Sequence, residues 1–300
     1  MAPKLAYPLA FGAALCLAVA LEAQDRHSAP GRRTTAEAQE LIDRVVANQK
    51  QNDRAMDVYE RIERVEVRKT GSDAKPASVR TARVIPAGTG TGKAPVGEDG
   101  KPANVALYRA EMEKIVKALA WAAEEGRAQR EAYEKIAKKK KERDQLIQST
   151  RTAFIYTFAG SEERGGVLLS KYAMEANPAF HPTTRMESVF TKVKGFVWVD
   201  DKSAQLARVE GDVTEDISVG LFFGRVYKGS HFMQERYEIA PGLWLPTFSQ
   251  YDFDGRKFFS SFAVHERTFY SNYRLIGPPK EALALLRAEL SKAGLAAGDP

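Results

Sequence analysis

The sequence predicts an α+β fold, in which an antiparallel, curved half-barrel sheet wraps helices and a long basic helix is inserted. Short strand-like segments follow one another from residue 153 to 275, separated by turn signals such as Gly165-Gly166 and Pro241-Gly242. Helical periodicity is confined to three segments outside that run. Many short strands with regular turns favour a sheet that curls, and segregated helices complete the α+β class.

The composition is that of a folded globular protein. Hydrophobic residues make up 44% of the 300 residues and charged residues 28%, a balance that excludes a disordered chain and a multi-span membrane protein. The 45 Lys and Arg against 39 Asp and Glu give a net charge of +6, too small to indicate nucleic-acid binding. Cys16 is the single cysteine, so a disulfide scaffold is also excluded.

Residues 1–23 have the pattern of a secretory signal peptide. Lys4 precedes an apolar run over 5–21, and small residues end the run at Ala18, Ala20 and Ala23. This order predicts an exported protein of the periplasm or cell envelope. An uncleaved N-terminal anchor is the alternative.

Cys16 lies within the apolar run and has two interpretations. A lipid-modified cysteine follows a small residue, whereas Leu15 precedes this one. This favours a cysteine that is lost when the signal peptide is cleaved.

The chain after the signal begins with a polar lead-in over 24–33 and a helix from Thr35, whose hydroxyl is suited to an N-cap. The period changes at Tyr59, and residues 64–69 alternate as a half-buried strand does. Residues 71–103 are rich in Gly, Pro, Ala, Ser and Lys, which predicts a long loop with at most one short strand around Val79, Val84 and Ile85.

Residues 104–148 carry a long helical pattern. Tyr108, Met112, Ile115, Leu119 and Ala122 lie on one stripe at spacings of four and three. We expect the helix to break or bend near residue 126. The loop and helix over 71–148 are predicted as an insertion in a half-barrel domain over 34–276.

The rest of the domain is predicted to be strands, and residues 277–300 a C-terminal helix and tail, with the helix over 280–292. The expected strands cover residues 153–158, 167–174, 187–193, 195–199, 204–213, 221–227, 231–239, 244–253, 257–264 and 269–275.

The motifs for catalysis, cofactors and metals are weak, so we expect a non-enzymatic protein with no cofactor, no catalytic residue and no metal site. The segment Gly88–Lys93 lacks the spacing of a phosphate loop, and Pro95 stands where a helix must begin. The four histidines stand alone, and no nucleophile elbow occurs. The pairs Asp200-Asp201 and Asp252/Asp254 flank expected turns. A hydrolase is the third hypothesis.

The run Lys138, Lys139, Lys140 and Lys141 has two interpretations. It is either the solvated face of a helix or a contact surface for an anionic membrane or an envelope protein. No aromatic residue alternates with these lysines, which argues against nucleic acid as a partner.

Aromatic residues are frequent in the predicted sheet, and several recur at every second position. Their shared face is either a filled core or a concave cavity that accepts an acyl chain. The candidate cavity residues are Phe196, Trp198, Phe222, Phe232, Trp244, Phe248, Tyr251, Phe253, Phe258 and Phe262.

Three segments carry a resemblance to a known family. They are Gly195-Phe-Val-Trp-Val-Asp200, the Gly turn before Trp244-Leu-Pro246, and Tyr270-Ser-Asn-Tyr-Arg274. In these segments the chain resembles the outer-membrane lipoprotein carrier family (LolA/LolB-like), over roughly residues 150–276. The resemblance implies a half-barrel of antiparallel strands around a helix that holds an apolar cavity. The matching residues are structural ones, and the long loop and basic helix over 71–148 depart from the family.

These observations give two main hypotheses. The first is an exported, non-enzymatic carrier that binds a lipid or an acylated protein in an apolar cavity lined by sheet aromatics. The alternative is an envelope structural or interaction module that works through the basic helix over 104–148.

Overall fold

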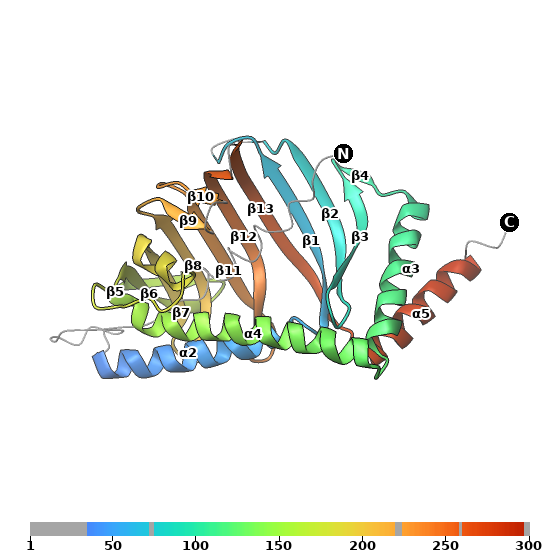
Figure 1. The fold of residues 1–300 in the computed structure, drawn as a ribbon, viewed down its shortest axis with the longest axis horizontal. Helices are drawn as coiled ribbons and strands as arrows, with labels where there is room; N and C mark the ends of the chain where they lie inside the picture. Colours follow the sequence, from blue (N-terminus) through green and yellow to red (C-terminus); the bar gives the residue numbers. More distant parts are fainter. Residues whose placement is uncertain (1–34, 72–74, 220–223, 258–259, 297–300) are drawn as a thin grey trace. The chain divides into compact units, whose positions relative to one another are not determined.

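The α+β class is confirmed. The computed structural model describes residues 35–296 apart from 72–74, 220–223 and 258–259 (Figure 1). The predicted signal over 1–23, Cys16 and the lead-in over 24–33 therefore lie outside the described residues. Within the described ranges, thirteen strands form an antiparallel sheet and are accompanied by helices.

The described helices are α2 (Thr35–Ala55), α3 (Val105–Ala122), α4 (Arg127–Ala153), α5 (Pro279–Ala296) and the 3-10 helix η1 (Glu187–Lys192). The strands are β1 (Tyr59–Arg68), β2 (Ser78–Pro86), β3 (Thr91–Glu98), β4 (Lys101–Pro102), β5 (Phe154–Arg164), β6 (Val167–Ala176), β7 (Val193–Asp200), β8 (Gln205–Val213), β9 (Ile217–Val219), β10 (Gly224–Val226), β11 (His231–Ala240), β12 (Leu243–Lys257) and β13 (Ser260–Leu275). The chain forms two compact units. Of the described residues, unit 1 holds those within 35–52, 68–71 and 142–267, and unit 2 holds those within 53–67, 75–141 and 268–296.

Unit 1 is a sheet with helices packed on one of its faces. Its strand order is β13-β12-β11-β8-β7-β6-β5, with β10 pairing β12 and β9 pairing β10. We call the helix-covered side the inner face. There, α2 contributes Leu41, Ile42, Val45 and Val46 to one apolar cluster, and the end of α4 contributes Ile147. The strands complete this cluster with side chains at every second position.

β-Bulges bend this sheet. Register shifts occur between β5 and β6 at Phe158/Gly160, between β7 and β8 at Trp198/Val199, and between β11 and β12 at Glu235/Arg236. An extra residue in one strand of a pair increases the local twist. The bulges account for the curvature that the sequence predicted.

Two glycines make room at the centre of the inner face. Gly195 of β7 and Gly211 of β8 are directly opposite each other. A Cβ added at Gly211 would lie 2.7 Å from the Phe232 ring, and one at Gly195 would lie 2.0 Å from the Glu210 carbonyl oxygen. The absence of both side chains therefore lets β7 and β8 approach closely and lets the Phe232 ring lie over them.

Unit 2 is a smaller sheet covered by two helices. Its strand order is β4-β3-β2-β1-β13, and α3 and α5 lie side by side (Figure 1). Asn104 caps α3, because its Oδ1 accepts the N–H groups of Ala106 and Leu107. The core of this unit consists of Ile85, Ala87, Ala94, Met112, Ile115, Leu119, Ile276, Ala282 and Leu286.

Most helix predictions are confirmed. A helix is present from the first described residue, Thr35, the long pattern breaks between Ala122 and Arg127, and a helix covers the predicted range 280–292. The two strands predicted over 257–264 and 269–275 form the single strand β13. Of the strand predicted over 221–227, the structure describes β10 (Gly224–Val226).

The long loop predicted over 71–103 is wrong, because β2, β3 and β4 occupy most of it. Strand β2 pairs with β1 residue by residue from Arg61↔Val84 to Val67↔Ser78. One of the glycines that suggested a loop, Gly92, serves the packing instead. A Cβ at Gly92 would lie 2.3 Å from Cγ1 of Ile115, so a glycine in β3 lets α3 approach the strand.

The strand predicted over 187–193 is also wrong, because η1 covers Glu187–Lys192. The Glu187 carboxylate accepts hydrogen bonds from the N–H groups of Thr183 and Thr184 and from the hydroxyls of Thr183 and Ser149. Burial by itself raises the pKa of Glu187, but these hydrogen bonds outweigh it and lower the pKa to about 2.

We expect Gly195→Ala to lower the free energy of unfolding by about 1–3 kcal/mol, because the new methyl group meets backbone atoms that cannot rotate away. The control is Gly90→Ala, where no atom lies within 4 Å of the added Cβ. Urea unfolding followed by tryptophan fluorescence measures both. Equal stability of the two variants would contradict the close approach of β7 and β8.

We expect Glu187→Gln to lower the free energy of unfolding by about 1–3 kcal/mol at pH 7. Because the pKa of Glu187 is about 2 in the folded protein and 4.5 ordinarily, this difference is present above pH 4.5 and disappears as the pH falls towards 2. Urea unfolding at neutral and acidic pH measures it. In contrast, the exposed Glu175→Gln should show no such dependence, and a constant difference for Glu187→Gln would refute the assigned role.

Candidate functional site

The inner face of unit 1 carries an apolar cluster with a partly exposed margin. The aromatic side chains Tyr156, Tyr172, Phe190 and Phe232 are fully buried in it. Five apolar side chains pack against the cluster and are only partly buried. We call them the margin residues: Leu146, Phe158, Phe180, Phe262 and Val264.

Rings connect this margin to the buried cluster. Phe158 meets Tyr172 edge-on, with ring centroids 5.8 Å apart. The Phe180 and Phe190 rings have centroids 6.5 Å apart. The margin is therefore continuous with the core and is formed by side chains from strands, from α4 and from the segment after β6.

Four of the predicted cavity residues belong to this inner face. Phe232, Tyr251 and Phe253 are buried in the cluster, and Phe262 lies at its margin. Tyr251 and Phe253 are two positions apart on β12, with ring centroids 5.7 Å apart. The alternation that the sequence showed at these positions brings them to one face.

Phe196 and Trp198 point to the opposite, outer face of the same sheet. Their neighbours Val197 and Val199 belong to the inner cluster, whereas Trp198 packs with Leu169, Ala207 and Trp244 in a separate apolar cluster. Phe196 is partly buried against this outer cluster. The structure thus divides the predicted cavity residues between two faces.

Phe248 of β12 is opposite Glu235 of β11 and is partly buried. Phe222 and Phe258 lie outside the described residues. Trp244 is buried, and its backbone N–H donates to Oδ1 of Asn52 at 3.2 Å.

Cations cover the rings of the outer face. Lys171 Nζ lies 4.1 Å from the Phe196 ring centroid and 4.7 Å from that of Trp198, while Arg208 Cζ lies 4.6 Å from Trp198. The Trp198 indole N–H donates to Glu162 Oε2 at 2.8 Å. Strands β6 and β8 place Lys171 and Arg208 directly opposite Trp198, so the cation–π contacts follow from the register.

Ion pairs complete this face. Arg164 pairs with Glu235, and Arg208 pairs with Glu210. Burial by itself lowers the pKa of Arg164, but its hydrogen bond and ion pair with Glu235 outweigh this and raise the pKa. With its arginines in ion pairs and its rings covered by cations, the outer face is less suited to an apolar ligand than the margin of the inner face.

The basic run lies on α4, and its four lysines differ in their partners. Lys140 forms an ion pair with Asp57. Lys138, Lys139 and Lys141 are exposed, and none of them forms an ion pair with a described residue. Three of the four lysines of the run therefore lack an ion-pair partner among the described residues.

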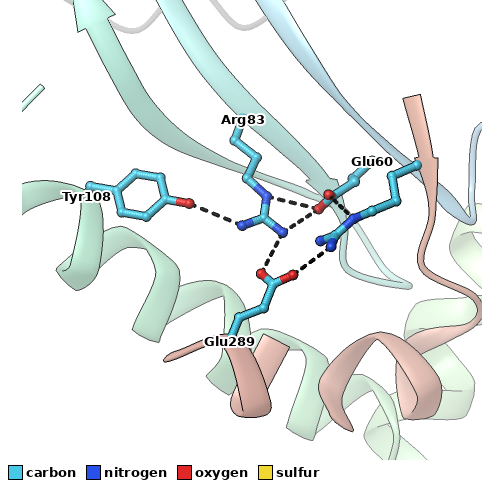
Figure 2. A network of polar contacts seen from close by, with 5 residues as sticks. Glu60, Arg83, Tyr108 and Glu289 are labelled. Carbon is cyan, nitrogen blue, oxygen red and sulfur yellow. Dashed lines mark hydrogen bonds and ion pairs between the residues drawn. The ribbon is translucent and has the colours of Figure 1, made fainter. Parts of the chain in front are cut away.

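Sequence reasoning missed a network of polar contacts around the buried Glu60 in unit 2 (Figure 2). Glu60 of β1 accepts from the Arg83 guanidinium at 2.7 and 2.9 Å and from Arg274 Nε at 2.6 Å. Glu289 of α5 pairs with the same two arginines at 2.9 and 2.7 Å. Arg83 Nη1 donates to the Tyr108 hydroxyl at 3.1 Å. Five elements of unit 2 are joined by these side chains.

The charges of the network stabilise one another. Burial by itself lowers the pKa of Arg83, but the hydrogen bonds with Tyr108 and Glu60 outweigh this and raise it. Burial raises the pKa of Glu289, and Arg274 and Arg83 reverse that shift, so the pKa is lowered. The signal in the sequence was the series Glu60, Glu63 and Glu66 in the segment that begins at Tyr59. All three are buried, but only Glu60 belongs to this network, because Glu63 pairs with Arg61 and Lys93 and Glu66 pairs with Arg64.

The motifs set aside as non-catalytic have other partners. Gly88–Lys93 forms the β2–β3 turn and the start of β3, and Lys93 Nζ lies 2.6 Å from Glu63 Oε2. His265 Nδ1 lies 3.1 Å from Asp252 Oδ1. Within the described ranges, no group of His, Cys, Asp and Glu residues is arranged to hold a metal ion.

Among the described residues, no helix combines the length and apolarity required to cross a bilayer. No protein-family model matches the chain, and no curated protein matches its sequence. Two solved structures are similar to it. One is a domain from Vibrio parahaemolyticus that is named as a putative outer membrane lipoprotein-sorting protein domain. The two sequences are 9% identical, the match covers 82% of this chain and 99% of that chain, and the TM-score is 0.31.

The other similar structure is a DUF1329 family protein from Desulfovibrio piger, with 11% identity, a TM-score of 0.24, and coverage of 77% of this chain and 92% of that chain. Neither likeness identifies a ligand or an activity for this chain.

We expect Glu60→Ala to destabilise unit 2 by about 3 kcal/mol, because it leaves two arginines without one of their two carboxylates. The control is Glu113→Ala, which removes an exposed pair with Arg109 and should cost less than about 1 kcal/mol. Hydrogen exchange of the amides of β1 and β2 measures the stability of this unit. Equal protection in both variants would contradict the role of Glu60.

Proposed function

We propose that the protein is an exported, non-enzymatic carrier that binds the acyl chain of a lipid or of an acylated protein on the inner face of unit 1. The observation that carries this proposal is the margin. Leu146, Phe158, Phe180, Phe262 and Val264 contact the buried core but remain partly exposed. The resemblance of the strand motifs to those of the lipoprotein carrier family also supports a carrier function.

The hydrophobic effect supplies the binding energy in this proposal. Apolar surface removed from water contributes about 25 cal/mol per Å², or about 0.8 kcal/mol for each buried methylene. An acyl chain lying on the β13 part of the margin would add to the burial of Phe262 and Val264 and lose its own contact with water. The centre of the cluster is already occupied by buried rings, so we expect the ligand at the margin, between strands and helix ends.

The two faces of the sheet provide a matched comparison. Phe262 and Phe196 are both partly buried phenylalanines of unit 1, but Phe262 lies at the inner margin and Phe196 on the outer face under Lys171. Replacing either with alanine removes the same atoms. The difference between the two variants therefore reports which face binds.

We expect delipidated protein to take up a fluorescent fatty acid, and Phe262→Ala to weaken uptake about five- to tenfold through lost apolar contact. Phe196→Ala should leave uptake unchanged. Fluorescence titration measures the affinity, and circular dichroism checks that each variant is folded.

Two results would overturn the proposal. One is the absence of uptake by folded, delipidated protein. The other is an equal loss of fatty-acid affinity in Phe262→Ala and Phe196→Ala, which would show that binding does not take place specifically at the inner face.

A further inference from the structure

A strongly basic surface lies on the part of α4 that belongs to unit 2. Between residues 135 and 141 the helix carries five lysines and no acidic residue. These are Lys135, Lys138, Lys139, Lys140 and Lys141. Neither the polar network of unit 2 nor the acyl-binding proposal uses them.

The opposite side of this helix is held to unit 2. Gln129 is buried, Ile136 is partly buried, and the Tyr133 hydroxyl donates to the Ala122 carbonyl at 2.9 Å. Lys140 forms an ion pair with Asp57. Residues 129, 133, 136 and 140 are spaced four, three and four apart, so they form one stripe.

The other lysines lie away from that stripe. Lys138 is two residues from both Ile136 and Lys140, which places it on the far side of the helix, and Lys135, Lys139 and Lys141 flank it. All four are exposed, and none of them forms an ion pair with a described residue. By contrast, Arg127 at the start of α4 pairs with Glu131.

Acidic neighbours reduce this charge only in part. Glu134 and Glu142 border the lysines on the same helix and are exposed. The segment from 134 to 142 still carries five cations against two anions. The surface is therefore complementary to a negative partner.

We propose that this surface docks the protein on an anionic phospholipid bilayer. Lysine ammonium groups are point charges on flexible stems, suited to headgroups whose negative charge is spread over a surface rather than fixed in one geometry. The exposed side carries no large apolar residue, so the contact is electrostatic and does not insert. Each cation near such a surface strengthens binding about fivefold.

The experiment uses the exported, mature protein and sedimentation with lipid vesicles. One set of vesicles contains phosphatidylcholine and phosphatidylglycerol in equal amounts, and the other contains phosphatidylcholine alone. The variant carries Lys138→Gln, Lys139→Gln and Lys141→Gln, which keep helix propensity because lysine and glutamine are similar helix formers. The control carries Lys194→Gln, Lys202→Gln and Lys228→Gln, three exposed lysines of unit 1.

Both triple variants remove the same net charge, so only the location differs. We expect binding to the anionic vesicles, weak binding to the neutral ones, and a roughly 100-fold loss in the α4 variant with the control unchanged. Binding should disappear at about 1 M salt, where the screening length is about 3 Å.

Equal loss in both variants, equal binding to neutral vesicles, or no binding to either would overturn the proposal. The last outcome would leave an acidic protein as the partner that the surface fits. The vesicle assay and the fatty-acid titration use different variants, so either proposal can fail without the other.

Discussion

The alternation of side chains along a strand is the constraint on which the functional surfaces of unit 1 depend. One residue of β7 that points inward is followed by one that points outward, so Val197 and Trp198 belong to different apolar clusters. Aromatic content alone predicts a large apolar surface, but the alternation divides that surface in two. The inner part is continuous with a core under α2, and the outer part is covered by Lys171 and Arg208.

Unit 2 differs from unit 1 because its sheet contains a buried charged residue, Glu60. Glu60 is buried on β1, whereas Ile62 on the same strand is only partly buried, and burying a carboxylate costs stability unless its charge is paired. Arg83, Arg274 and Glu289 supply that pairing from three other elements. Buried ion pairs contribute little net stability but penalise alternative arrangements, since any shift of β1 against β2 leaves a charge unpaired. The network therefore specifies the register of this smaller sheet.

Local signals predicted the parts of the fold that local physics controls. The helix from Thr35, the break after Ala122 and most strands of unit 1 follow from periodicity and turn residues. The prediction failed where tertiary contacts outweigh composition. Strand β3 contains glycine because Ile115 of α3 comes close to it, and η1 forms because the Glu187 carboxylate gathers nearby N–H and hydroxyl groups. A single sequence shows neither the approaching helix nor the buried carboxylate.

The same limit applies to the candidate site. The alternation of Tyr251 with Phe253 correctly predicted that both share a face, because two positions on one strand are a local relation. Whether Trp198 lies on that same face depends on the register of several strands.

The acyl-binding proposal and the membrane-docking proposal rest on different forces, which respond differently to salt. Electrostatic docking through α4 weakens as ions screen the lysines, whereas burial of an acyl chain does not depend on charge and is strengthened by salts excluded from protein surfaces.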